Sequence, residues 1–341
     1  MPSIKSAGNA FGAFNSVKNF VNVVREVDFE DVRQRAERLP SIIVVAQTDE
    51  DAQEAAERIF GERPQRHVEI RALAPGEELA TQRYDIIVVH DPAQAHLLER
   101  VRAQAGTDST AKIFYLPASL PGGMLPEDQV RTEIAVSLPD LAPAIGRFIP
   151  TFRVAAARAI MDETAKANAQ FALVSNIPAA IPLFGNLLAA SADLIVLTKN
   201  QIMMCYKLAA LHGRDLHDQT QIFTELAPVV GAGFLWRTLA REGAALLPFA
   251  AGTVPKVAIA YGGTLAVGWS ADFYFRYGKK PTRAQLSEFS KRANQLARSL
   301  PFLQDGKADA SATPSASTTP TTPIPLPTTD DAPTEPLPPV S

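Results

Sequence analysis

Short apolar segments alternate with helical patterns between residues 41 and 150, and this alternation constrains the fold more than any other feature. Ser41–Ala46 (S-I-I-V-V-A) and Asp85–His90 (D-I-I-V-V-H) are continuous apolar runs, typical of strands buried on both faces. Two more strands are expected at Val68–Leu73 and Lys112–Leu116, and helices at Asp49–Phe60, Pro92–Gln104 and Glu127–Val136. The pattern predicts a Rossmann- or P-loop-like α/β domain, with a parallel sheet covered by helices on both faces.

The following 150 residues contain no comparable alternation of strands. They are long segments rich in alanine and leucine, interrupted by prolines. Helical patterns extend over Thr151–Ser175, Leu183–Leu211, Asp218–Arg241, Val254–Tyr277 and Thr282–Ser299. We therefore expect an all-α bundle after the α/β domain.

The two ends of the chain differ from both domains. Phe11, Phe14, Val17, Val21 and Val24 recur at helical spacing, and a second helical pattern covers Phe29–Leu39. The last 37 residues contain 9 prolines among Ser, Thr and Ala, a composition typical of disorder. The expected organisation is a helical leader (1–40), an α/β domain (41–150), a helical domain (151–304) and a disordered tail (305–341).

The net charge of −3 conceals a strong asymmetry. Residues 1–150 hold 16 basic and 22 acidic side chains, residues 151–304 hold 16 and 9, and residues 305–341 hold 1 and 5. The basic helical domain predicts an anionic neighbour, which is a membrane surface, a nucleic acid or the acidic first domain. One cysteine excludes a disulfide framework, and the lack of an apolar N-terminal run predicts no secretory signal.

The first apolar strand is followed by residues unsuited to nucleotide phosphates. A phosphate loop needs glycines to present N–H groups and a lysine to meet the outer charges. The chain instead has Gln47, Thr48 and three carboxylates, Asp49 to Asp51. The sequence predicts no working P-loop, no nucleotide cofactor and no metal.

Two further motifs resemble reactive sites, and each has a structural explanation. Asp193–Gln201 (D-L-I-V-L-T-K-N-Q) imitates a guanine-reading motif, but Gln201 replaces the required carboxylate and the flanking residues predict one continuous helix. His212–Asp218 (H-G-R-D-L-H-D) suggests metal or acid–base chemistry. Gly213 and Asp218 are placed to end one helix and begin the next, so a polar loop is expected there.

Two long uncharged segments are candidates for a membrane-spanning helix. Ala169–Ala192 contains no formal charge over 24 residues but includes Pro178 and Pro182, and Val257–Ala271 has only 15 uncharged residues. Neither is a continuous apolar run of about 20 residues, so the sequence predicts no clear spanning helix.

Residues 254–283 nevertheless carry three features of a membrane-contacting helix. Small residues recur every four positions, as in a stripe that packs on a neighbouring helix such as Leu183–Leu211: Ala258, Gly262, Ala266 and Ser270. Aromatic residues gather as in an interfacial belt: Trp269, Phe273, Tyr274, Phe275 and Tyr277. Basic residues follow as cytoplasmic anchors: Arg276, Lys279, Lys280 and Arg283. A soluble hairpin with a solvated basic end is the alternative. Nucleic acid is not expected, because aromatics are not interleaved with the later basic residues.

The helical half resembles a known bacterial family. The stretch from Ala167 to Lys280 is similar to the YcjF-like family, the domain of unknown function numbered 697. The matching segments begin with N-A-Q-F-A-L-V-S-N-I-P at Asn168, L-T-K-N-Q-I-M-M at Leu197 and K-L-A-A-L-H-G at Lys207, and the glycine-punctuated segment from Pro248 to Tyr277 follows. The resemblance implies an inner-membrane protein whose helical domain follows a GTPase-like domain.

If the first half descends from such a GTPase, it departs from it at each nucleotide motif. The Asp85 strand ends in His90-Asp91-Pro92 in place of D-x-x-G, and the Lys112 strand lacks the base-reading lysine and aspartate. The favoured function is a non-enzymatic interaction or scaffold protein at the cytoplasmic side of the inner membrane. Its expected partner is an anionic membrane surface or a membrane protein, and a homo-oligomer is compatible with the sequence. A nucleotide-dependent switch with a non-standard pocket and a cytoplasmic scaffold remain open.

Overall fold

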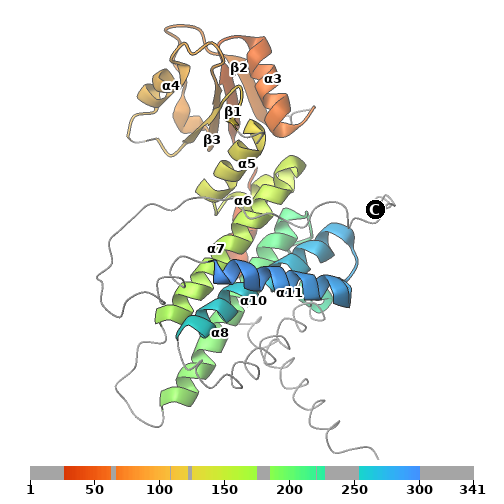
Figure 1. Ribbon diagram of the computed structural model, residues 1–341. Coiled ribbons are helices and arrows are strands. Elements are labelled where there is room, and N and C mark those ends of the chain that lie inside the picture. The colour runs from red at the N-terminus through yellow and green to blue at the C-terminus, as the bar shows by residue number, and fades with distance from the viewer. Residues whose placement is uncertain are drawn as a thin grey trace, which may run out of the picture. The chain divides into compact units, whose positions relative to one another are not determined.

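A computed structural model describes residues 27–62, 67–107, 109–121, 125–174, 185–219, 221–226 and 253–299, with only the backbone given for 185–195, 253–256 and 298. The expected helix over 11–24, much of that over 218–241 and the tail lie outside these residues. The chain forms two compact units. Of the described residues, those within 30–160 and 210–214 form the sheet unit, and those within 27–29, 161–209 and 215–299 belong to the helical unit (Figure 1).

The sheet unit contains a four-stranded parallel sheet, as the sequence predicts. Its strands are β1 (Ile42–Ala46), β2 (Val68–Ala72), β3 (Ile86–His90) and β4 (Lys112–Leu116). Their order is β2-β1-β3-β4, and every neighbouring pair is parallel. Strand β1 therefore pairs with β2 on one side and with β3 on the other.

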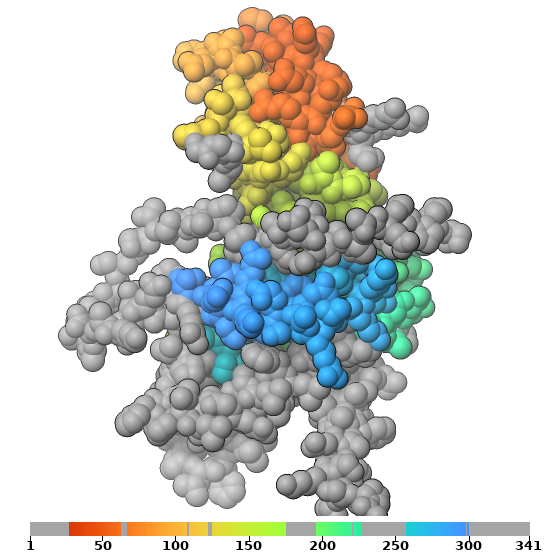
Figure 2. Space-filling view, turned by 45° about the vertical axis from the view of Figure 1, so that its right-hand side comes forward, coloured from red at the N-terminus to blue at the C-terminus, as the bar shows by residue number. Residues whose placement is uncertain are grey.

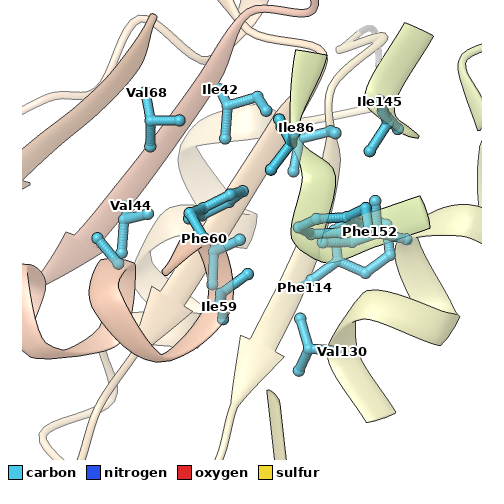
Figure 3. Close-up of a cluster of buried hydrophobic side chains, with 14 of the residues drawn as sticks. Ile42, Val44, Ile59, Phe60, Val68, Ile86, Phe114, Val130, Ile145 and Phe152 are labelled. Carbon is cyan, nitrogen blue, oxygen red and sulfur yellow. The ribbon is translucent and has the colours of Figure 1, made fainter. Parts of the chain in front are cut away.

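Successive residues of β1 and β3 point to opposite faces of the sheet, and both faces are covered. Ile42 and Val44 belong to a core with side chains of α3 (Asp49–Phe60), α5 (Pro126–Ser137) and α6 (Ala142–Phe148). Ile43 and Val45 belong to a second core with side chains of α4 (Leu97–Ala105). Figure 3 shows the first core, in which the rings of Phe60 and Phe152 stack at 5.5 Å.

Local signals fix the limits of α3 as the sequence predicts. The Thr48 side chain accepts a hydrogen bond from the Asp51 N–H, which caps the first turn. At the other end Gly61 has φ +97° and its N–H donates to the Glu57 carbonyl. Glycine adopts this left-handed conformation without steric cost, so the helix ends there.

Two helices of the sheet unit differ from expectation. The helix expected to begin at Pro92 begins at Leu97, because the preceding residues form a loop around Asp91. Helix α6 has no counterpart in the predicted pattern, since it is short and Gly146 lowers its helical signal. Gly146 is nevertheless required, because a Cβ there would lie 2.7 Å from the Leu211 side chain.

The helical unit follows the expected pattern of long helices. They are α7 (Arg153–Val174, which begins in the sheet unit), α8 (Gly185–Leu211), α10 (Thr253–Tyr277) and α11 (Arg283–Arg298). Helix α11 starts with a capping box in which Thr282 and Gln285 bond each other's backbone N–H groups. Figure 2 shows α11, in blue, at the surface of the helical unit.

Candidate functional site

The carboxyl ends of β1 and β3 mark the place where open parallel sheets bind ligands. Chain connections from these two strands depart in opposite directions, which leaves a crevice at their ends in many α/β proteins. Here that position is occupied by Gln47 and Thr48 after β1 and by Asp91 after β3. Their contacts decide whether a ligand site exists there.

Asp91 is 5% exposed, and its carboxylate is used inside the fold. One oxygen accepts from Gln47 Nε2 at 3.1 Å and from the Ala95 N–H at 3.0 Å, and the other accepts from the Leu97 N–H at 2.9 Å. The intervening loop is exposed, and its Gln94 and His96 have φ of 54° and 59°. Asp91 therefore holds this loop and links the residue after β1 to the end of β3, so its carboxylate is engaged in hydrogen bonds within the fold.

The start of α3 is acidic and bonded in the same way. The Asp49 carboxylate accepts from the Ala72 N–H at 2.9 Å, which joins the ends of β1 and β2. Asp51 accepts from the Thr48 hydroxyl at 2.7 Å. These carboxylates stand where a phosphate site would present N–H groups and a lysine, so the electrostatics oppose an anion.

The histidine at the end of β3 completes the same edge. His90 is 3% exposed and its Nδ1 lies 2.8 Å from the Leu116 carbonyl at the end of β4. The imidazole is thus used to join two strand ends. In the sequence His90 and Asp91 stand out as departures from a GTPase motif, and a polar pair at the end of a buried strand is the signal of their structural role.

The two motifs that imitate reactive sites have the structures expected of them. Asp193–Gln201 lies within the continuous helix α8. In the polar loop Gly213 has φ +78°, and the Asp218 carboxylate accepts from the Gln221 N–H at 2.8 Å as an N-cap. Within the described ranges, no group of three or more His, Cys, Asp or Glu side chains could hold a metal ion.

The aromatic residues expected at a membrane interface are divided between interior and surface. Trp269 is 2% exposed and packs edge-on against Phe289 at 6.2 Å, and Phe275 is also buried. Phe273, Tyr274 and Tyr277 are half-buried, and the Tyr274 hydroxyl donates to Glu225 at 3.1 Å. Trp269 and Phe275 thus face the protein interior, which differs from the interfacial position expected of them.

The basic residues near these aromatics lie in and beside the turn between α10 and α11. Arg276 is bonded to Asp272 at 2.9 Å, four residues earlier on the same helix. Lys279, Lys280 and Arg283 are exposed, and in the part of the chain that the structure describes they have no hydrogen-bond or ion-pair partner. We call these three residues the cationic turn.

The expected small-residue stripe contacts α11 at Gly262. A Cβ on Gly262 would lie 3.2 Å from the Ala293 carbonyl oxygen, so α10 and α11 approach closely there. The sequence instead suggested α8 as this neighbour. Ser270 bonds back to the Ala266 carbonyl of its own helix, and Ala258 is half-buried. The glycine that meets α7 and α8 is Gly268, against Met161 and Met204, and it lies outside the stripe.

Sequence reasoning did not identify a polar cluster inside the helical unit. Asn168 on α7, Asn200 and Gln201 on α8 and Thr264 on α10 are joined by hydrogen bonds of 2.7–3.1 Å. The available signal was the presence of amide side chains within otherwise apolar helices.

Two buried titratable groups of the helical unit are held in their neutral forms. Burial raises the pKa of the Cys205 thiol to about 12. Burial, together with the negative charge and hydrogen bond of Asp162, raises the pKa of Tyr261. A thiol that stays protonated is a poor nucleophile, so Cys205 functions as a core residue.

No protein-family model matches the chain, and no curated protein and no solved structure matches it. Among the helices of the described residues, none is both long enough and apolar enough to span a membrane.

Proposed function

We propose that the protein is a non-enzymatic interaction protein that associates with an anionic membrane surface. The sheet unit is a GTPase-like head of the P-loop class that has lost its phosphate loop, and the helical unit is the anchor. The cationic turn is the main support for the membrane part of this proposal. The hydrogen-bonded carboxyl ends of β1 and β3 support the non-enzymatic part.

The hydrogen bonds at the carboxyl ends of β1 and β3 support a sheet unit that functions without a nucleotide. A ligand at the ends of β1 and β3 would have to displace the Gln47–Asp91 hydrogen bond, and it would meet the acidic start of α3. The strand order fits a doubly wound sheet, and the resemblance of the helical half to the YcjF-like family favours GTPase ancestry.

The cationic turn supports association with an anionic surface because its charges are free to act. A paired cation is already partly neutralised, whereas Lys279, Lys280 and Arg283 are exposed and unpaired within the described chain. Their spacing is fixed by Gly278, with φ +63°, and by the capping box at Thr282. Each Lys or Arg near an anionic bilayer contributes about 1 kcal/mol of attraction.

Flotation with liposomes tests the membrane part. Full-length protein is mixed with vesicles that contain about 30% phosphatidylserine or with neutral vesicles, and we expect flotation only with the first. Changing Lys279, Lys280 and Arg283 to glutamine should weaken binding roughly a hundredfold, because about 3 kcal/mol of attraction is lost.

A matched variant separates local from overall charge. Arg83→Gln, Arg102→Gln and Lys112→Gln remove the same charge from exposed positions of the sheet unit and should leave flotation unchanged. Equal losses in both variants would mean that net charge alone drives binding. A wild-type protein that stays at the bottom of the gradient while folded and monodisperse would refute the membrane association.

A nucleotide-dependent switch is the second candidate, and the β3–α4 loop is the observation that favours it. Gln94 and His96 hold left-handed conformations, and such strain is often found at functional sites. Titration of full-length protein with GTP or ATP and magnesium decides between the two. We expect no heat of binding. Saturable binding at micromolar nucleotide would refute the nucleotide-free interaction protein and support the switch.

A further inference from the structure

A layer of four polar side chains joins three helices inside the helical unit. Asn168 on α7 and Thr264 on α10 are fully buried, Gln201 on α8 is 2% exposed, and Asn200 on α8 is half-buried. The Thr264 hydroxyl oxygen accepts from Asn168 Nδ2 at 2.9 Å and from Gln201 Nε2 at 3.1 Å. Asn200 Nδ2 donates to Asn168 Oδ1 at 2.7 Å.

Thr264 is the hub of this layer. Its hydroxyl also donates to the Ala260 carbonyl at 2.7 Å, so its proton and both lone pairs are used. One side chain of α10 is therefore bonded to α7 and α8 at the same time. The positions of the three helices along their axes are linked at this point.

The close approach at Gly262 aligns α10 with α11, whereas burial alone does not single out one alignment of α10 with α7 and α8. All residues of Ala260–Leu265 and of Val267–Asp272 are buried, so the helix is enclosed on every side. A helix with one apolar stripe has a single favourable orientation, whereas a helix buried all round has many. The contact at Gly268 is made by Met161 and Met204, and methionine adapts readily to a changed neighbour.

We propose that the polar layer selects the alignment of α10 with α7 and α8. A slip of α10 by one turn would break the two hydrogen bonds that Thr264 accepts from α7 and α8, and it would leave the buried amides of Asn168 and Gln201 without this partner, which is strongly unfavourable. A single polar position fixes register in the same way in coiled coils, at a cost in stability.

Cysteine crosslinking in the full-length protein tests this alignment. In a Cys205→Ala background, Met161→Cys with Gly268→Cys reports the native alignment, because these two residues are in contact. Met161→Cys with Leu265→Cys reports a slip of about one turn of α10. Each pair is oxidised with and without an apolar layer made by Asn168→Leu, Gln201→Leu and Thr264→Val.

We expect the native pair alone to crosslink when the polar layer is intact. With the apolar layer, we expect both pairs to crosslink and the tryptophan near-ultraviolet circular dichroism to weaken, while the melting temperature stays equal or rises. Exclusive native crosslinking and an unchanged spectrum in the apolar variant would overturn the proposal.

Two single variants keep the test decisive if the triple variant does not fold. Thr264→Ser retains the hydroxyl and should preserve exclusive native crosslinking, whereas Thr264→Val should lose it. Ser270→Ala is the matched control, because this buried hydroxyl of α10 bonds only the Ala266 carbonyl of its own helix among the described contacts. Equal crosslinking in Thr264→Ser, Thr264→Val and Ser270→Ala would also overturn the proposal.

Discussion

The sheet unit and the helical unit place their polar groups differently. In the sheet unit, polar side chains lie where elements end: Asp85 accepts from Arg38 and from the Ser41 N–H before β3, and Asp91 bonds the loop after it. In the helical unit, Asn168 and Thr264 lie in the middle of helices. A polar residue at the end of an apolar run is easily recognised in a sequence, whereas one inside a long apolar helix is not.

Arg131 of the sheet unit and the cationic turn of the helical unit differ in whether their charges have partners. In the sheet unit Arg131 donates to the Ile59 and Arg58 carbonyls at the end of α3 and pairs with Asp128. The cationic turn of the helical unit has no such partners among the described residues. Arg131 therefore has a structural role in the first unit, whereas the cationic turn of the second unit is available for binding.

The largest effect is expected in the core of the sheet unit. Phe152→Ala removes a fully buried ring that stacks on Phe60, and we expect a loss of about 3–5 kcal/mol in the free energy of unfolding. Urea denaturation of full-length protein measures this loss. Val136→Ala, on the exposed face of α5, is the control and should change stability by less than about 0.5 kcal/mol.

The first comparison also explains how far the sequence could predict the fold. The limits of α3 and β4 were predicted to the residue. Thr48 and Gly61 cap the two ends of α3, and β4 begins at Lys112. The start of α4 was wrong by five residues, because the hydrogen bonds of Asp91 to the loop are tertiary and leave no periodic signal. Helix α6 was missed because it is short and because packing against Leu211, distant in sequence, overrides the low helix propensity of Gly146.

The candidate sites show the same limit. The absence of a phosphate loop was apparent from Gln47 to Asp51, but the Gln47–Asp91 bond joins residues 44 positions apart. Trp269 and Phe275 satisfy the composition of an interfacial belt, yet contacts with Phe289 and other residues bury them. Composition indicates which residues suit a membrane surface, whereas tertiary packing decides which of them are exposed.

The second prediction tests structural charge in the sheet unit. Arg131→Gln removes hydrogen bonds from a guanidinium to two carbonyls that end α3, and we expect a loss of about 2 kcal/mol in the free energy of unfolding. Arg102→Gln, at an exposed position on α4, serves as the control. Equal urea midpoints for both variants and wild type would show that arginine pairing is not structural in this unit.

The third prediction concerns the apolar interior of the helical unit. Burial raises the pKa of Cys205 to about 12, so the folded thiol stays protonated at pH values where the unfolded one ionises. The stabilisation is complete below the unfolded pKa, near 9.0, and is lost as pH rises toward 12. Between pH 7 and pH 10, wild type should lose about 1.5 kcal/mol more than Cys205→Ala in denaturation experiments. Parallel pH profiles for the two proteins would contradict a buried, neutral thiol.

The smallest effect on stability is expected at the cationic turn. Changing Lys279, Lys280 and Arg283 to glutamine removes exposed charges without partners in the described chain, so the free energy of unfolding should change by less than about 0.5 kcal/mol. The same variant should lose anionic-liposome binding roughly a hundredfold. Thermal melts and flotation on one preparation measure both. A marked loss of stability would place these cations in the fold, and the contrast with Arg131 would then disappear. Unchanged stability with lost binding would show that the cationic turn serves a partner, because charges needed for folding would affect both measurements.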